Sequence, residues 1–442
     1  MENKNIKYII CLVMSFLIGA CDFDIPNPNA ASEDQVLTTA EGLFALSIGI
    51  RTTYSAGSNL SALRDVILTP GVTTRELAIT STFQSLIDLE EGGPLLPNDN
   101  GNTTRLFTRL NRVKGMAENL IASAPNVPLI EGTRSGFIAY GHLFKAICLG
   151  NLAQNFEQVP IDNSLNNDAA FSPRQAAYEE AIQLLEQAIS LINTTPISSE
   201  FSTTVLAGNI DLGNTLNAYL SRYNLFAGNY QAAIDAADAV DLSSTSIFSF
   251  DGENLNPIFD QINNGPPSYT ARQNFGTPLL DPADGRLDFY TELYDPVDST
   301  NQNGLPIARL KGFFGANDPI PVYVPGEVLL NKAEALARLN QLNEAITEIN
   351  KVRTKTDDPF GINADLPAYG GAITAEAVLE EIFLNRRAEL FLTGVSLEDS
   401  RRFGRPEPPA TPDLSSERNR NFYPYPLEER LNNPNTPDDP GI

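Results

Sequence analysis

The sequence predicts an all-α protein, a TPR-containing helical solenoid decorated with long irregular insertions. Apolar residues recur at helical spacing in several long segments, and alanine-rich helix pairs repeat along the chain. The composition agrees with a globular fold, because 42% of the 442 residues are hydrophobic. A chain of this length can bury a large core without disulfides or a metal.

The first residues are predicted to be an export signal. Two lysines precede an apolar run that ends in Leu-Ile-Gly-Ala before Cys21. The run from Tyr8 to Ala20 has 13 residues, fewer than the roughly 20 that a membrane span needs. Small residues before a cysteine indicate a lipoprotein signal over residues 1–20, with an acyl anchor on Cys21. An ordinary secretory signal with an incidental cysteine is the alternative.

Cleavage of this signal changes the charge and the cysteine count. Two lysines and one glutamate leave, so the net charge moves from −25 to −26. Such an acidic chain would be repelled by nucleic acid, and its attachment to a membrane would rely on acyl chains. Residues 21–34 are predicted to be an extended acidic tether, because Pro26 and Pro28 block a helix. Cys148, in an apolar helical stretch, is expected to be a buried thiol without a disulfide partner.

The helices are predicted within residues 35–442, which we expect to form a single domain. Each carries apolar residues on one face, and they are residues 42–54, 105–121, 136–155, 176–192, 217–240, 328–353 and 374–392. The fifth and sixth segments each divide in two, at Gly228-Asn229 and at Asn340-Gln341. Ser172-Pro173 predicts an N-cap for the fourth segment, and Thr374 one for the last.

Three of these segments align on a small residue. Ala181, Ala233 and Ala345 are each followed by isoleucine, with apolar or small residues again four and seven positions on. This is the pattern of tetratricopeptide (TPR) helix pairs, in which alanine lets helices pack closely. The alanines are 52 and then 112 residues apart, so we expect a solenoid interrupted by insertions.

Two insertions, residues 87–104 and 243–321, are rich in Gly, Pro, Asn and Asp and show no helical period. Loops this long usually carry function. Aromatic rings stack on the C–H faces of sugars, and amides and carboxylates bind hydroxyl groups. The ligand candidates for a surface patch are Asn98, Asp99, Tyr269, Phe275, Tyr290 and Tyr294. The alternative is that half or more of the rings anchor the loops to the body. The proline-rich tail from Arg405 is expected to wrap the surface.

Catalytic and metal sites are not expected. One histidine, His142, excludes a multi-His metal centre and makes a Ser-His-Asp enzyme a poor hypothesis. Adjacent carboxylates such as Glu179-Glu180 point in different directions around a helix, which disfavours a glycosidase pair. The oxygen-rich segments 98–101 and 301–304 are interpreted as turns, because they lack the regular ladder and the terminal Glu of a calcium loop. A calcium site remains the alternative there.

Several segments, in a shared order behind the signal, resemble the SusD/RagB family of outer-membrane lipoproteins. They are residues 37–54, 137–161, 172–174, 284–287, 319–336, 385–404 and 422–435. The 385–404 segment carries an Arg-Arg-x-Glu-Leu run, and the 422–435 segment a Tyr-x-Pro run near the end. Glu157-Gln158, Thr393, Ser396 and Phe403 depart from the family pattern, so the resemblance is to a divergent member.

The resemblance implies a function. Such a protein is not an enzyme; it sits lipid-anchored on the outer membrane, facing the cell exterior, and captures an oligomeric nutrient. It delivers this nutrient, as a lid, to a TonB-dependent (SusC-like) transporter barrel. An oligosaccharide is the favoured ligand, a peptide is the alternative, and a TPR scaffold for another protein is a further hypothesis. The chain has no tryptophan, the usual large stacking platform for sugars, which adds weight to a peptide.

Five charged residues lie at the family's motif positions: Arg386, Arg387, Glu389, Arg401 and Arg402. We expect them to form structural ion pairs that lock the last helix to the solenoid. An anion-binding site is the alternative.

Overall fold

The computed structural model describes residues 37–57, 60–263 and 267–442. The predicted signal over residues 1–20, the anchor Cys21 and the tether over residues 21–34 lie outside these described residues. Within them helices dominate, which confirms the all-α prediction. No helix of the described chain is long and apolar enough to cross a membrane.

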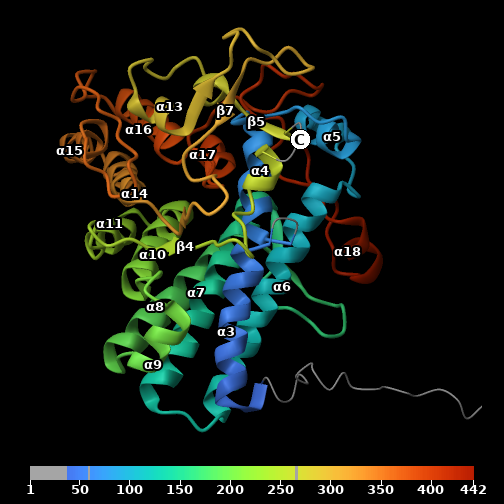
Figure 1. The fold of residues 1–442 in the computed structure, drawn as a ribbon, viewed down its shortest axis with the longest axis vertical. Helices are drawn as coiled ribbons and strands as arrows, with labels where there is room; N and C mark the ends of the chain where they lie inside the picture. The colour runs from blue at the N-terminus through green and yellow to red at the C-terminus, as the bar shows by residue number, and fades with distance from the viewer. Residues whose placement is uncertain (1–36, 58–59, 264–266) are drawn as a thin grey trace, which may run out of the picture.

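The lower body is built from long helices that run side by side (Figure 1). They are α3 (Ala40–Ser55), α6 (Gly101–Ser123), α7 (Glu131–Asn155) and α8 (Arg174–Thr194). α7 is buried along nearly its whole length, because α6 and α8 pack on it. Cys148 on α7 is a fully buried free thiol, as expected, and burial raises its pKa. Burial also lowers the pKa of His142 to about 4.

Helix pairs continue from this body to the upper left of Figure 1. They are α10 (Leu212–Ala227) with α11 (Tyr230–Asp238), and α14 (Pro325–Arg338) with α15 (Leu342–Arg353), followed by α16 (Ala375–Glu389). The chain turns between the paired helices where predicted, with Gly228 and Asn340 in positive-φ conformations. Ala181, Ala233 and Ala345 are completely buried at the helix contacts. Thr374 caps α16 by accepting the N–H of Ala377.

A small antiparallel sheet lies at the upper end of the molecule. Its strands, in spatial order, are β1 (Leu77–Ile79), β5 (Tyr269–Arg272), β7 (Ile307–Leu310) and β6 (Thr291–Leu293). Three of the four strands come from the 243–321 insertion, together with α13 (Gly285–Tyr290). Strands of three or four residues are too short to show a clear alternation, which is why the sequence did not reveal them.

A second strand pair corrects a predicted cap. β2 (Gln158–Pro160) pairs with β3 (Phe171–Pro173), so Ser172-Pro173 belongs to a strand. α8 begins after it, at Arg174, without a side-chain cap, and the predicted N-cap is wrong. The remaining short elements are α9 (Ser199–Phe201), a π-helical turn (Ser202–Leu206), β4 (Ile247–Phe248), α12 (Phe259–Asn263) and β8 (Ile320–Pro321).

Besides the short α9, α12 and α13, the helices that were not predicted are α4 (Ala62–Thr73), α5 (Gln84–Glu91), α17 (Ser396–Arg402) and α18 (Leu427–Asn432). α4 is buried on every side, so no polar face marks it in the sequence. α5 occupies the start of the 87–104 segment that was expected to be irregular. It is followed by a 3₁₀ turn, Gly93–Leu95, before α6 starts.

The tail beyond Arg405 does more than wrap the surface. Tyr423 and Tyr425 are fully buried, and the Tyr423 hydroxyl lies 2.7 Å from Thr73 Oγ1 of α4. The Tyr425 hydroxyl accepts the N–H of Gln158 at 2.9 Å. The two rings are large apolar groups with a polar tip, which favours burial against the body over exposure. The prediction of a surface tail is therefore wrong for this segment.

Candidate ligand-binding surface

Three of the four aromatic ligand candidates are buried. Tyr269, Phe275 and Tyr290 are at most 2% exposed. Phe275 stacks on Phe391 with ring centroids 4.1 Å apart, and Tyr290 meets it edge to face. These rings hold the 243–321 insertion on the helical body and present no face to a ligand. A surface patch built on them is wrong, and they follow the alternative that loop aromatics act as anchors.

Tyr294, at the end of the sheet, is half-buried. The Arg309 guanidinium lies over its ring, 5.1 Å from the centroid, and its hydroxyl is 3.3 Å from Thr270 Oγ1. Part of the ring remains accessible, so Tyr294 stays a candidate.

The Asn98-Asp99 candidates lie in the turn before α6. Asp99 is exposed, and the Asn98 carbonyl accepts the N–H of Leu427 at the start of α18. The next residue, Asn100, caps α6 by accepting the N–H of Asn102 at 3.0 Å. Its Nδ2 donates to the Ser85 carbonyl at 2.8 Å, which fastens this turn to α5. The segment is a turn and a helix cap, as its residue types predict.

Phe83 is the exposed aromatic residue that the sequence reasoning missed. It immediately precedes α5 and is 66% exposed, whereas every other described Phe or Tyr is buried or half-buried. Ser85, two residues on, carries the carbonyl that binds Asn100, so Phe83 lies near the Asn98-Asp99 turn. A lone aromatic in the polar run Thr80–Ser85 was the available signal.

The loop between β6 and β7 is hydrogen-bonded to the segment that carries Phe83 and to α5. Gln302 Nε2 donates to the Ser81 carbonyl at 3.3 Å. Asn301 and Asn303 donate side-chain N–H groups to the buried Glu90 carboxylate, at 3.2 and 2.5 Å. Burial raises the pKa of Glu90, and the hydrogen bonds from the Ile79 N–H and from Asn303 oppose that rise. The loop is thereby held against β1 and α5.

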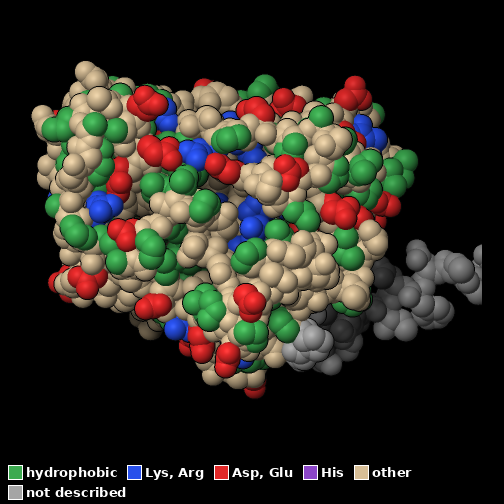
Figure 2. Space-filling model, turned by 90° about the horizontal axis from the view of Figure 1, so that it is seen from above, with side chains coloured by type: hydrophobic (Ala, Val, Ile, Leu, Met, Phe, Trp, Pro, Cys, Tyr) green, Lys and Arg blue, Asp and Glu red, His purple; other side chains and the backbone are tan. Residues whose placement is uncertain are grey.

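We call Phe83, Asn98, Asp99 and Gln302 the α5 surface. It lies at the upper end of the molecule, where α5 adjoins the sheet (Figure 1). Figure 2 looks down on that end, where hydrophobic side chains are dispersed among acidic and basic ones. A ring flanked by amides and a carboxylate can stack on one part of a ligand and hydrogen-bond another.

The five motif residues lie apart from this surface, in buried polar contacts between α14, α16 and α17. Arg386 donates two hydrogen bonds to Asp399, at 2.8 and 3.0 Å. Arg402 donates two to Glu334, at 2.7 and 2.8 Å. Burial would raise the pKa of Glu334, but the adjacent arginines outweigh it and lower the pKa to about 2.

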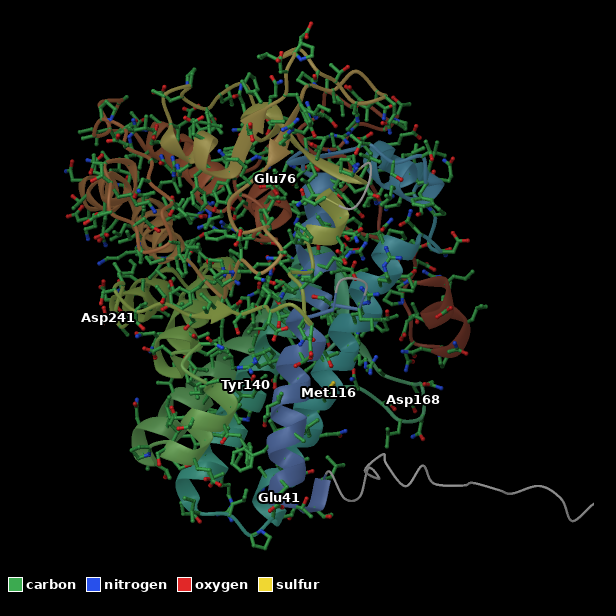
Figure 3. The ribbon with its side chains drawn as sticks, viewed as in Figure 1. Glu41, Glu76, Met116, Tyr140, Asp168 and Asp241 are labelled. Atoms are coloured by element: carbon green, nitrogen blue, oxygen red, sulfur yellow. The ribbon has the colours of Figure 1, made fainter. Side chains whose placement is uncertain are left out.

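The other three motif residues join neighbouring segments. Arg401 pairs with Glu398 at 2.6 Å, and Glu389 pairs with Arg286 at 3.2 Å. Arg387 donates to the carbonyl oxygens of Thr74 and Phe275, and so ties α16 to α4 and to the insertion. Glu76, labelled in Figure 3, is buried near Arg387, and burial raises its pKa. These side chains bind one another and the backbone, which is the structural role that the family positions suggest.

The described part of the chain contains no group of three or more His, Cys, Asp or Glu side chains placed to hold an ion. The 301–304 segment is a turn, in which the Gly304 N–H donates to the Asn301 carbonyl at 3.0 Å.

Comparisons with known proteins support the fold, and one family model matches part of the chain. The SusD family model matches residues 311–439. A SusD superfamily protein from Bacteroides thetaiotaomicron has a TM-score of 0.70 at 17% identity, over 91% of this chain and 100% of that one. A putative sugar binding protein from Bacteroides vulgatus has a TM-score of 0.68 at 15% identity, over 91% and 99%. A SusD-like carbohydrate binding protein from Bacteroides fragilis has a TM-score of 0.67 at 13% identity, over 90% and 99%. At these identities the structures show a shared fold. No curated protein sequence matches the chain.

Proposed function

We propose that the chain belongs to the SusD family, whose model matches residues 311–439, and that it captures an oligomeric nutrient at the cell surface. The α5 surface is the observation that supports this proposal. Phe83 offers an exposed ring, and the segments that are hydrogen-bonded to Ser81 and Ser85 on either side of it carry amides and a carboxylate. Binding sites for small polar ligands combine these two elements.

An oligosaccharide is the ligand that we favour. Two solved structures of this fold are named as sugar or carbohydrate binding proteins. The stacking group here is a phenylalanine, and the chain has no tryptophan, so the contact with a sugar would be smaller. The net charge of −25 disfavours acidic polysaccharides, because polyanions would meet like charge.

Affinity electrophoresis tests the ligand class. The protein would be run through gels that contain neutral polysaccharides, and in parallel titrated against a peptide library. Slower migration in a neutral glycan gel is the expected result. Binding to peptides alone would overturn the oligosaccharide and make this protein a peptide-capturing member. Reducing-end assays after long incubation with the same glycans would reveal turnover, which we do not expect.

The proposed partner is a TonB-dependent transporter barrel, over which the protein closes as a lid, held at the outer membrane by acyl chains on Cys21. The lipoprotein signal and the family support this arrangement. Purification of the tagged protein from detergent-extracted membranes should recover a large β-barrel protein. The matched control is a Cys21→Ser variant, which should appear in the aqueous fraction. A lipidated protein that purifies alone in several mild detergents would contradict the partnership.

A further inference from the structure

A groove lies where α6, the β2–β3 connection and α18 meet, and Figure 1 shows α18 on the right-hand side of the molecule. It has a volume of 380 Å³, within the ~300–1,000 Å³ range of small-molecule sites. Three elements line it: the outer face of α6 over residues 107–112, the β2–β3 connection over residues 160–169, and the end of α18. Asp168, labelled in Figure 3, marks the connection beside α18.

The walls of this groove are fixed by hydrogen bonds from both sides. Asn163 Nδ2 in the connection donates to the Asn111 carbonyl of α6 at 2.8 Å. Asn433 Nδ2, just beyond α18, donates to the Ala169 carbonyl at 3.0 Å. Lys114, buried in α6, donates to the Pro160 carbonyl at the base of the connection. The connection is therefore clamped between two helices, and the groove is preformed.

These bonds use amide nitrogens and leave several amide oxygens free, although the Asn433 oxygen accepts the N–H of Asn435 at 3.0 Å. The groove is lined by five asparagines: Asn111, Asn163, Asn167, Asn432 and Asn433. Asn111 Oδ1 is a buried oxygen with no hydrogen-bond partner among the described residues. The Nδ2 of Asn432 donates to the Glu428 carbonyl, and its oxygen accepts no bond from the described chain. No described residue donates to the exposed side-chain oxygens of Asn163, Asn167 and Asn432, so these oxygens can accept hydrogen bonds from a ligand that carries donors.

The charge of the groove and its exposed apolar side chain indicate which chemical class of ligand it fits. Arg112 and Glu429 contribute one charge of each sign, so the groove is neutral on a chain of net charge −25. Leu165 is fully exposed at the rim, whereas Phe107 and Pro160, among the lining residues, are buried. Free acceptors beside an exposed leucine, without net charge, suit the hydroxyl groups and C–H faces of a neutral sugar.

We propose that this groove is a second ligand-binding site, which takes a neutral, hydroxyl-rich oligosaccharide segment through its amide oxygens. The site is separate from Phe83 and does not depend on the α5 surface. Asn98 of that surface contacts the first turn of α18, whereas the groove uses the last.

Hydrogen–deuterium exchange of the full mature protein tests the second site. Maltohexaose, cellohexaose, xylohexaose and mannohexaose would be added singly at millimolar concentration. At least one should slow exchange in residues 161–170 several-fold, in the wild type and equally in Phe83→Ala. A variant with Leu165→Ala, Asn167→Gly and Asn432→Ala should lose that protection. Asn167 has a positive φ, which glycine preserves, and the other two positions are exposed, so the variant should fold.

The matched control replaces exposed residues of the same types elsewhere, Leu339→Ala with Asn343→Ala, and should keep the protection. Three outcomes would overturn the proposal. The first is that no neutral hexasaccharide slows exchange in residues 161–170. The second is that the groove variant is protected as strongly as the wild type. Loss of protection in Phe83→Ala would instead show that the groove only responds to the α5 surface. If only the assignment of the α5 surface is wrong, a hexasaccharide should still slow exchange in residues 161–170, and no ligand binding should depend on Phe83.

Discussion

At the scale of single residues, Glu334 shows how the buried charges stabilise the fold. Its carboxylate has no exposed surface and accepts hydrogen bonds from Arg338 and Arg402 at 2.7–2.8 Å. Removal of one partner from such a pair leaves an uncompensated buried charge, at a typical cost of about 3–5 kcal/mol. We predict that Glu334→Gln lowers the free energy of unfolding by that amount in urea. Glu186→Gln, at an exposed site in α8, should change it little; equal effects would contradict the stabilising role.

The low pKa values of Glu334 and Glu398 predict that the stability of the fold depends on pH. Burial would raise the pKa values of Glu334 and Glu398, but neighbouring arginines lower both from 4.5 to about 2. The unfolded chain therefore binds these protons more readily than the folded protein. Their contribution to stability is complete above about pH 4.5 and is lost as the pH falls toward 2. Denaturation at a series of pH values should give a shallower fall for Glu334→Gln than for the wild type, and parallel curves would contradict this.

The candidate ligand-binding residues show which features of the site residue type alone can predict, and which it cannot. Asn98 and Asp99 were identified because turn chemistry is local, and the structure places them in a turn at the surface. Tyr290 was chosen as a stacking platform, yet it is buried against Phe275, because burial depends on how the insertion folds back onto the body. Phe83 was missed because a lone ring in a short polar segment has no periodic context.

At the scale of elements, the crossing of α7 and α10 depends on Gly150. A Cβ at this position would lie 2.1 Å from the Tyr223 ring of α10, which is itself fully buried. Overpacking of this kind typically costs about 1–3 kcal/mol. We predict that Gly150→Ala lowers the thermal unfolding midpoint. Gly213→Ala, in α10, meets only an atom at 3.8 Å and should leave the midpoint unchanged or slightly raised. A midpoint for Gly150→Ala equal to that of the wild type would show that the crossing tolerates a wider spacing.

Element prediction succeeded where one helix face is buried and the other is exposed. α8, α11 and α15 have such faces, and their periodicity was read correctly from the sequence. α4 is buried on all sides and shows no polar face, and the sheet strands are too short for alternation to appear. Both kinds of element owe their conformation to tertiary contacts that a local pattern does not encode.

At the scale of the whole molecule, one apolar core joins the ends of the chain. It includes Leu43 of α3 and, near the C-terminus, Tyr423 and Tyr425. Truncation of a large buried ring typically costs about 3–5 kcal/mol. We predict that Tyr423→Ala destabilises the whole fold in urea denaturation, whereas Leu431→Ala, at an exposed site in α18, does not. Unaltered stability of Tyr423→Ala would show that the tail is not part of the core.

The central claim is that the molecule captures its ligand on the α5 surface. Isothermal titration of the ligand found by electrophoresis would compare the wild type with Phe83→Ala and Ile130→Ala. Ile130 is the matched control, because it is 65% exposed against 66% for Phe83 but lies at the start of α7. We predict that Phe83→Ala weakens binding about tenfold, or ~1.4 kcal/mol, while Ile130→Ala binds as the wild type does. Equal affinities for all three proteins would contradict the assignment of the α5 surface.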